Sequence, residues 1–499
     1  MSLGSFVKSI QNIMRGDAGI NGDAQRIEQM TWILFLKVYD VKEEDWEFHD
    51  ENYKSIIPEE YRWRNWAKDE SDGNALTGDD LLNFVNGVAN NDTLTGLFPT
   101  LKELPVTIET PMKKLIVKAV FEDANQYMKD GILLRKVINI IDGIEFDDYK
   151  ERHAFGEIYE TILKSLQSAG NAGEFYTPRA VTDFMVKMIQ PKLGERIADF
   201  ACGTGGFLTS SLKELEKQVS TVKDRELYNQ SVFGIEKKPL PYLLGITNML
   251  IHDIDEPEII HGNSLERNVR EFREEDKFDI VLMNPPYGGT EGEGIKMNFP
   301  ADMRSSETAD LFISLIMYRL KQNGRAAVIL PDGFLFGTDN AKSSIKEKLI
   351  KEFNLHTIIR LPSSVFSPYT SITTNILLFD KTKTTESVWF YRLDMPEGYK
   401  HFSKTKPMQL DHFNECIEWW NNRKEIKDLE TDTFKSKEYT KKEIEELEYN
   451  IDQCGYPSIE EVVLSPEETI QVFHEKRDSL NAKIDRKLKE ISEFLGIDL

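Results

Sequence analysis

Residues 196–208 read RIADFACGTGGFL, an apolar segment that ends in Asp199 and then runs into a cluster of glycines. A helical pattern follows from Phe207 to about Val219, so the stretch predicts a strand, a tight turn and a helix. Glycines lack the Cβ atoms that would hold a ligand away from the backbone, and the first N–H groups of the helix are free to bind it. We interpret the stretch as a ligand-binding turn of an α/β sheet, although a purely structural turn would share this pattern.

Two further predicted strands end in polar side chains. The spacing Gly-x-Gly-x-x-Gly that dinucleotides prefer is absent from the glycine turn, which argues against NAD as the ligand. A strand over 231–236 ends in Glu236, at the position where such sheets bind a ribose diol. A strand over 258–263 ends in Asn263, which either bonds an adenine edge or forms a plain turn. Glu236 is therefore the candidate for binding a ribose, and the role of Asn263 stays open between the two.

A second motif indicates the chemistry. The tetrapeptide Asn284-Pro285-Pro286-Tyr287 directly follows an apolar run over 278–283. An amino group conjugated to a ring is a poor nucleophile, and two hydrogen-bond acceptors can draw its hydrogens out of the ring plane. The Asn284 amide oxygen and the Pro285 carbonyl are two such acceptors, and Tyr287 offers a face for a planar substrate. The motif predicts methyl transfer to a planar amino group, or, taken alone, a plain turn at a strand end.

Length and patterning divide the chain into three regions. With 499 residues the chain is too long for a single core. Residues 1–165 carry apolar side chains at helical spacing and predict a helical bundle. Residues 166–390 alternate strands with helices, which predicts a mainly parallel sheet covered on both faces, with its loops converging on one crevice. Residues 391–499 are charged and end in a helical pattern over 466–494, which packs against a partner helix or internally.

Within the middle region, the patterns place helices over 309–322 and 342–353 and strands over 325–330 and 373–380. The glycine- and acid-rich stretch 288–294 predicts a mobile flap beside the tetrapeptide.

Together these segments resemble the modification (M) subunit of bacterial Type I restriction–modification systems, over nearly the whole chain. The order of the segments fits, and the most specific of them is Gly-Glu-Phe-Tyr-Thr-Pro-Arg at 173–179. The resemblance implies the α/β fold of class I S-adenosylmethionine-dependent methyltransferases, a Rossmann-like, mainly parallel sheet, with an N-terminal helical bundle and a C-terminal helical segment. It also implies methylation of adenine N6 in DNA, with S-adenosylmethionine (SAM) as the cofactor.

The resemblance assigns roles to residues of these segments. The implied catalytic residues are Asn284, Pro285, Pro286, Tyr287 and Phe366. The last lies in a late segment over 358–370 and either stacks on the extruded base or is an ordinary core aromatic. The implied cofactor contacts are Glu174, Phe175, Tyr176, Thr177, Pro178, Arg179, Asp199, Gly203, Thr204, Gly205, Gly206, Glu236 and Asn263. One departure is Phe200, since methyltransferases of this type commonly carry proline after the strand-end acid.

The net charge bears on the partners. The chain has 62 basic and 85 acidic residues, a formal charge of −23 that repels a phosphate backbone. The resemblance accounts for the negative charge, because M subunits work with a separate specificity (S) subunit that recognises the DNA sequence. It implies two M subunits per S subunit as the usual arrangement, and a restriction (R) subunit in the full complex. Local basic surface is expected around Lys187, Lys192, Arg304 and the lysines of 342–351, unless these are ordinary solvated side chains.

The remaining composition excludes several classes. Three cysteines without paired spacing and eight scattered histidines predict neither disulfides nor a metal site. No apolar run reaches membrane-spanning length and no export signal is recognisable, so a cytoplasmic protein is expected. Two other functions stay open: a protein glutamine methyltransferase, whose target amide is also planar, and a non-catalytic assembly subunit that keeps the fold.

Overall fold

The computed structural model describes residues 3–69, 75–90, 93–107, 109–144, 156, 159–164, 176–403, 405–427 and 433–455, and scattered positions between 470 and 489. Residues 1–455 form one compact unit and residues 456–499 a second. Each unit is described by itself.

The N-terminal part of the first unit is helical, as predicted. Its helices are α1 (Leu3–Arg15), α2 (Asp23–His49), α3 (Trp63–Trp66), α4 (Gly78–Asn86), α5 (Leu97–Lys102), α6 (Met112–Asp123) and α7 (Gly131–Asp142), with a small hairpin of β1 (Val88–Asn90) and β2 (Thr93–Thr95). The apolar spacing in α2 buries Ile27, Met30, Leu34 and Val38. Aromatic side chains fill the centre of this bundle, where Phe98 packs edge-to-face on both Trp32 and Phe121.

A ten-stranded sheet forms the rest of the first unit, in the order β11-β12-β10-β8-β9-β7-β6-β3-β4-β5. Its strands are β3 (Ile197–Asp199), β4 (Val232–Glu236), β5 (Glu258–His261), β6 (Phe278–Met283), β7 (Leu320–Pro331), β8 (Asn354–Arg360), β9 (Thr374–Asp380), β10 (Ser387–Arg392), β11 (Ile426–Lys427) and β12 (Phe434–Thr440). Strands β5, β4, β3, β6 and β7 are parallel neighbours, and β9 runs antiparallel between β7 and β8. The sheet is therefore mainly parallel around β3, and the carboxyl ends of five strands share one edge.

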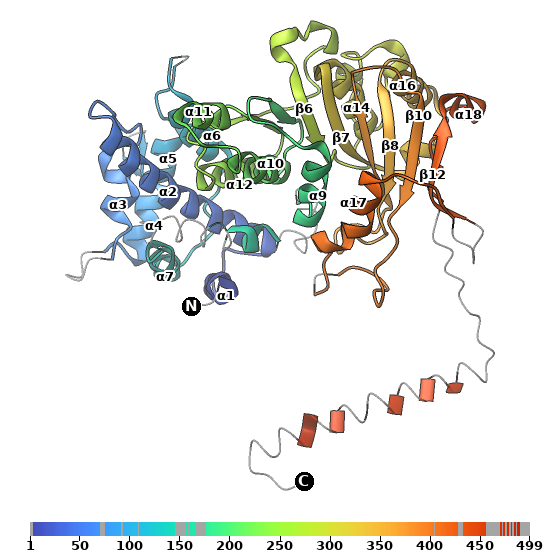
Figure 1. Ribbon diagram of the computed structural model, residues 1–499. Coiled ribbons are helices and arrows are strands. Elements are labelled where there is room, and N and C mark those ends of the chain that lie inside the picture. Colours follow the sequence, from blue (N-terminus) through green and yellow to red (C-terminus); the bar gives the residue numbers. More distant parts are fainter. Residues whose placement is uncertain are drawn as a thin grey trace. The chain divides into compact units, whose positions relative to one another are not determined.

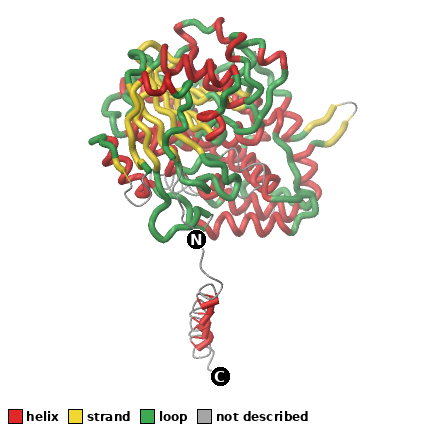
Figure 2. Tube along the Cα trace, turned by 90° about the vertical axis from the view of Figure 1, so that its right-hand side faces the viewer, coloured by secondary structure: helices red, strands yellow, loops and turns green. Residues whose placement is uncertain are grey.

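Helices cover the sheet, and Figure 2 shows the strands as one twisted layer among them. They are α9 (Arg179–Ile189), α10 (Gly206–Glu216), α11 (Val222–Asn229), α12 (Pro239–Ile251), α13 (Glu293–Lys296), α14 (Thr308–Arg319), α15 (Asp332–Phe336), α16 (Asn340–Lys351), α17 (Asn414–Asn421) and α18 (Lys441–Glu446). Helix α12 packs against α2 and α6 on one side and against β4 and β5 on the other, so it joins the N-terminal helices to the sheet (Figure 1).

Most predicted elements lie within a few residues of the observed ones, and two differ in a way that the sheet explains. The helix predicted over 309–322 ends at Arg319, because Leu320 pairs with Phe278 of β6 and so belongs to β7. The predicted domain boundary at residue 390 falls inside β10, which pairs in parallel with β8. A catalytic domain that contains the whole sheet would extend at least to Thr440; the division into three regions stays a prediction.

The predicted C-terminal helix over 466–494 lies mostly outside the described residues. Of its predicted apolar positions, Ile484 and Leu488 are described, and both are helical and exposed. Within the part of the chain that the structure describes, no helix is long and apolar enough to cross a membrane.

Candidate active site

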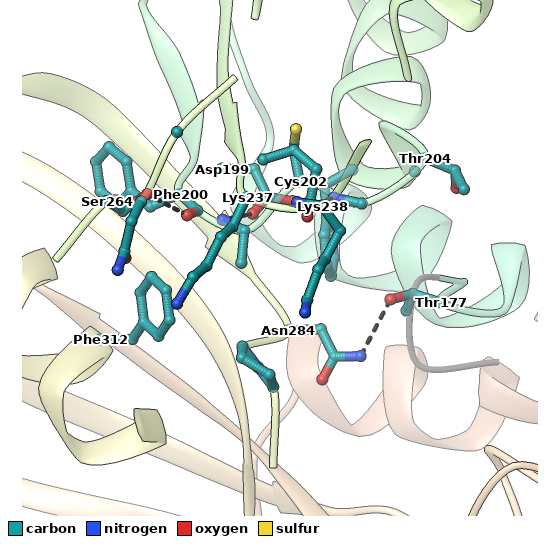
Figure 3. Close-up of a pocket in the computed structure, with 18 of the residues that line it drawn as sticks. Thr177, Asp199, Phe200, Cys202, Thr204, Lys237, Lys238, Ser264, Asn284 and Phe312 are labelled. Atoms are coloured by element: carbon teal, nitrogen blue, oxygen red, sulfur yellow. Dashed lines mark hydrogen bonds between the residues drawn. The ribbon is translucent and has the colours of Figure 1, made fainter. Parts of the chain in front are cut away.

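A pocket with about 820 Å³ of empty space lies where the carboxyl ends of β3, β4, β5 and β6 meet (Figure 3). It is lined by Thr177, Asp199, Phe200, Ala201, Cys202, Gly203, Thr204, Gly206, Phe207, Glu236, Lys237, Lys238, Gly262, Asn263, Ser264, Asn284, Pro286, Glu291 and Phe312. Parallel strands bring their carboxyl ends to one edge, which is why segments about 100 residues apart in sequence share this pocket.

The glycine turn forms one wall. Gly203 and Gly205 have φ values of 53° and 77°, in the left-handed region that favours glycine. A Cβ on Gly206 would lie 2.4 Å from Nη1 of Arg179, and a Cβ on Gly234 would lie 2.9 Å from Sγ of Cys202. The turn is held from behind by α12, whose Asn248 amide donates to the Thr204 carbonyl at 2.9 Å. Only glycines permit this close packing, so the turn keeps its backbone at the pocket wall.

Glu236 ends β4 inside the pocket. Its carboxylate accepts from the Gly203 N–H at 2.9 Å and from the Lys238 N–H at 2.7 Å, and the side chain is 6% exposed. The carboxylate therefore ties the end of β4 to the glycine turn and lines the pocket.

Burial changes the acidity of the groups at the end of β3. Burial raises the pKa of Asp199 to about 8, and the charge of Glu236 adds to the rise, although the Ala201 N–H opposes it. Burial also raises the pKa of the Cys202 thiol well above its usual value. A thiol held neutral in this way is a poor nucleophile, which agrees with a packing role for Cys202.

The Asn-Pro-Pro-Tyr loop begins where β6 ends. The Asn284 amide donates from Nδ2 to Oγ1 of Thr177 at 3.1 Å (Figure 3). Its Oδ1 accepts from the hydroxyl of Tyr287. These two bonds set the orientation of the amide. A carbonyl oxygen has two lone pairs, so Oδ1 keeps one acceptor site for a substrate.

A second, smaller pocket, shallow and open to solvent, adjoins the first. It is lined by Tyr176, Asn284, Pro285, Pro286, Tyr287, Phe366 and Tyr369, and it shares Asn284 and Pro286 with the larger pocket. The rings of Tyr287 and Phe366 lie 6.5 Å apart, nearly perpendicular to each other. An aromatic slot thus opens beside the acceptor of Asn284, and its walls suit a planar, unsaturated group.

Similarity to known proteins agrees with this geometry. Residues 150–462 match the family model of the N-6 DNA methylases, and residues 3–141 match that of the HsdM N-terminal domain. The chain is 51% identical over 440 residues to the methylase subunit of the Type I restriction enzyme EcoEI from Escherichia coli, which covers 88% of this chain and 86% of that protein.

Two solved structures extend the similarity to the fold. One, described as a modification subunit of a type I restriction enzyme from Vibrio vulnificus YJ016, has a TM-score of 0.75 at 42% identity, covering 89% of this chain and 92% of the other. Another, from work on assembly and conformational transition of the type I R-M system, has a TM-score of 0.78 at 34% identity, covering 98% of both chains.

The chain belongs to the Type I restriction-enzyme methylase subunits. It is an adenine-specific DNA methyltransferase with the class I methyltransferase fold, as the sequence predicted. The DNA methylase family match disfavours the glutamine methyltransferase.

The predicted cofactor contacts of this methylase subunit divide into three groups. Seven line the larger pocket: Thr177, Asp199, Gly203, Thr204, Gly206, Glu236 and Asn263. Four lie beside it. Gly205 is part of the glycine turn, and Tyr176 lines the smaller pocket. Pro178 precedes α9, and Nε of Arg179 lies 2.8 Å from Oε2 of Glu160. Glu174 and Phe175 lie outside the described residues. The roles of all of them stay predictions.

Several pocket residues of this subunit were missed from sequence. Lys237 and Lys238 directly follow Glu236, and Ser264 directly follows Asn263. Their positions just after predicted strands could have identified them as pocket residues. Phe312 comes from α14, where a buried helical pattern gives no hint of a pocket. The stretch predicted as a flap contributes Glu291, whose carboxylate lies 3.5 Å from Nζ of Lys237. Part of that stretch is helical, since α13 begins at Glu293.

The prediction that the lysines of 342–351 form a basic surface is wrong for Lys342 and Lys346. Lys342 is buried and its ammonium lies within 3.1 Å of carboxylate oxygens of Glu307, Asp310 and Asp339. Lys346 is also buried and donates to the carbonyls of α15 and its end. Both stabilise the packing of α16, because a buried ammonium needs partners within the protein. Among the described residues of this subunit, no cluster of three or more His, Cys, Asp or Glu side chains could hold a metal ion.

Proposed function

We propose that the larger pocket binds SAM and the smaller one the target adenine, and that the chain transfers the methyl group to adenine N6 in duplex DNA. The observation that carries the proposal is the shared wall: the two pockets meet at Asn284 and Pro286. The residues of the larger pocket fit SAM, because the Glu236 carboxylate lines the pocket at the end of β4 and the glycine turn leaves room against the backbone.

When bound, SAM supplies an electrophilic methyl carbon, which N6 attacks as S-adenosylhomocysteine leaves. Asn284 prepares the nucleophile, because its Oδ1 accepts one N6 hydrogen while Thr177 and Tyr287 hold the amide in place. The carbonyl of Pro285 accepts the other hydrogen. When both hydrogens are drawn out of the ring plane, the nitrogen lone pair is no longer delocalised into the ring. The nitrogen is then a better nucleophile.

The aromatic residues of the smaller pocket hold the extruded base. Tyr287 and Phe366 present rings to the slot, and a flipped adenine gains contact with them in place of its lost stacking. Phe366 is 5% exposed and packs in the core as well, so it supports the slot from behind. Both roles of Phe366 weighed from the sequence are thus compatible with its position.

The N6 proton leaves to solvent in this scheme. Among the residues that the structure describes, those lining the smaller pocket include no carboxylate, histidine or lysine. Attack on the methyl carbon leaves N6 positively charged and strongly acidic, so water at the exposed side of Pro286 suffices as the acceptor. The side chains of this chain orient the amino group and do not need to act as a general base.

The partners follow from charge and family. A chain with a formal charge of −23 needs help to hold DNA, so we propose that a specificity subunit recognises the sequence, with two methylase chains per specificity subunit and a restriction subunit in the full complex. Residues 456–499 form the second unit and are the proposed contact with a partner chain. Deleting residues after Pro466 is expected to reduce co-purification with the specificity subunit; unchanged co-purification would contradict this.

The test mixes the purified chain with SAM labelled in its methyl group and DNA that lacks modification, with and without the specificity subunit. Label at adenine N6 that requires the partner supports the proposal. Asn284→Ala is the matched control, and it is expected to bind SAM without transferring label. Label on protein instead would favour a glutamine methyltransferase, and SAM binding without any transfer would favour an assembly subunit.

A further inference from the structure

A short basic segment stands out from this acidic chain. Residues 398–410 contain Lys400, His401, Lys404 and Lys406 and no acidic residue, although the whole chain carries a formal charge of −23. The segment leads into a short 3-10 helix, Leu410–Phe413, that precedes α17, and it is orange in Figure 1. Lys404 lies outside the described residues. Acidic residues border the segment at Glu397 and Asp411, and the run of cations between them is a candidate site for an anionic partner.

The segment is well anchored. The ring of Phe402 is buried, and its backbone N–H donates to Oγ of Ser364 at 2.9 Å. Ser403 and Lys406 exchange two backbone hydrogen bonds of 3.1 Å, which close the turn between them. The side chains of Lys400 and Lys406 are exposed, and within the described part of the chain no carboxylate pairs with either of them. The cations are therefore presented to solvent on a fixed backbone.

The anchor lies on the loop that builds the base pocket. Ser364 precedes Phe366 and Tyr369, which line the smaller pocket, and backbone bonds from Ser367 to Ser364 and from Tyr369 to Phe366 make this loop compact. The basic segment is thus bonded directly to the loop that would hold the target base. A base flipped from a duplex stays attached to its backbone, so its phosphates must lie close to this loop.

We propose that Lys400 and Lys406 bind the phosphate backbone of the DNA beside the flipped adenine. The inference rests on the proposed function and adds the surface that positions its DNA substrate. Lysine suits this role, since phosphate contacts fix register without reading sequence. Local contacts of this kind let an acidic chain engage DNA at one place while its remaining surface repels it.

The test is Lys400→Ala with Lys406→Ala in the full chain bound to its specificity subunit. Losing two phosphate contacts is expected to raise the KM for DNA roughly 10- to 30-fold at near-physiological salt and to reduce the salt slope of DNA binding by about 2. The kcat at saturating DNA and the Kd for SAM stay unchanged. The matched control, Lys217→Ala with Lys223→Ala, removes two exposed lysines outside both pockets and leaves the KM unchanged.

An unchanged KM and salt slope in the Lys400 and Lys406 variant would overturn the inference. Loss of assembly with the specificity subunit, measured by size-exclusion chromatography, would also overturn it and assign the segment to an acidic protein surface. Failure of the proposed function is distinguishable, because the wild-type complex would then transfer no label to adenine at all.

Discussion

Glu236→Gln is the most informative single change in the cofactor pocket. The carboxylate accepts two backbone N–H bonds, from Gly203 at 2.9 Å and from Lys238 at 2.7 Å, and it lines the pocket that we propose holds the ribose. Glutamine has one oxygen and one NH2 group. Whichever way the amide turns, one backbone N–H faces another donor, and one of the two acceptors for the ribose is lost.

The structure sets the size of the effect. A hydrogen bond to a charged group contributes about 1.5–3 kcal/mol, and a tenfold change in affinity corresponds to about 1.4 kcal/mol. Losing one ribose acceptor should therefore raise the Kd for SAM about 10- to 150-fold. The unpaired buried N–H should also lower the stability of the free protein by about 1–3 kcal/mol.

The assay is isothermal titration calorimetry with SAM, alongside thermal unfolding of the free protein. Glu258→Gln serves as the control, because Glu258 lies at the start of β5, pairs with Arg196 on the surface and is absent from the pocket wall. It should leave the Kd unchanged. A Kd for SAM that rises less than threefold in folded Glu236→Gln would refute the assignment of Glu236 to the ribose.

Three further changes test other parts of the site. Asn284→Ala should abolish label transfer and change the Kd for SAM little, since its partner Thr177 stays in place; a large rise in the Kd would place Asn284 in cofactor binding instead. For Asp199, the folded pKa of about 8 exceeds the usual value of 3.8, so its contribution to stability is present below about pH 4 and is lost as the pH rises through about 8. Asp199→Asn should flatten the fall in unfolding free energy between pH 5 and 9, measured by urea denaturation of the SAM-free protein, and an identical slope in both proteins would contradict the burial argument. Lys342→Met should cost about 3–5 kcal/mol of stability by leaving the buried Asp310 carboxylate without its cation, without any change in the salt slope of DNA binding; a stable variant with weak DNA binding would restore Lys342 to the DNA surface.

The local sequence pattern predicted the limits of strands correctly where these depend only on residues within the strand. The apolar run over 278–283 is strand β6 residue for residue, and the strands at Glu236 and before Asn263 begin and end within two residues of their predicted limits. Strand β9 was predicted as a strand. Its antiparallel position between β7 and β8 could not be predicted from the sequence, because the direction of a strand depends on the strands with which it pairs. The extension of the sheet by β10 and β12 was missed for the same reason.

The roles of side chains that contact residues far apart in the chain could also not be predicted from the sequence. Nothing near Lys342 in the chain marks it as buried, since two of the carboxylates around it come from the start of α14. Phe312 reaches the pocket only because α14 packs beneath the strand ends. The bond between Phe402 and Ser364, which ties the basic segment to the base pocket, joins residues that no spacing rule relates.

The sequence by itself determined the strand and helix pattern, the ligand-binding turn and the Asn-Pro-Pro-Tyr loop, because each depends on residues adjacent in the chain and on their backbone preferences. Tertiary structure alone decided the rest. Thr177 and Tyr287 orient the Asn284 amide, Glu236 ties its strand to the glycine turn, and two pockets share one wall. These depend on distances across the sheet, which are set by the packing of strands and helices far apart in sequence.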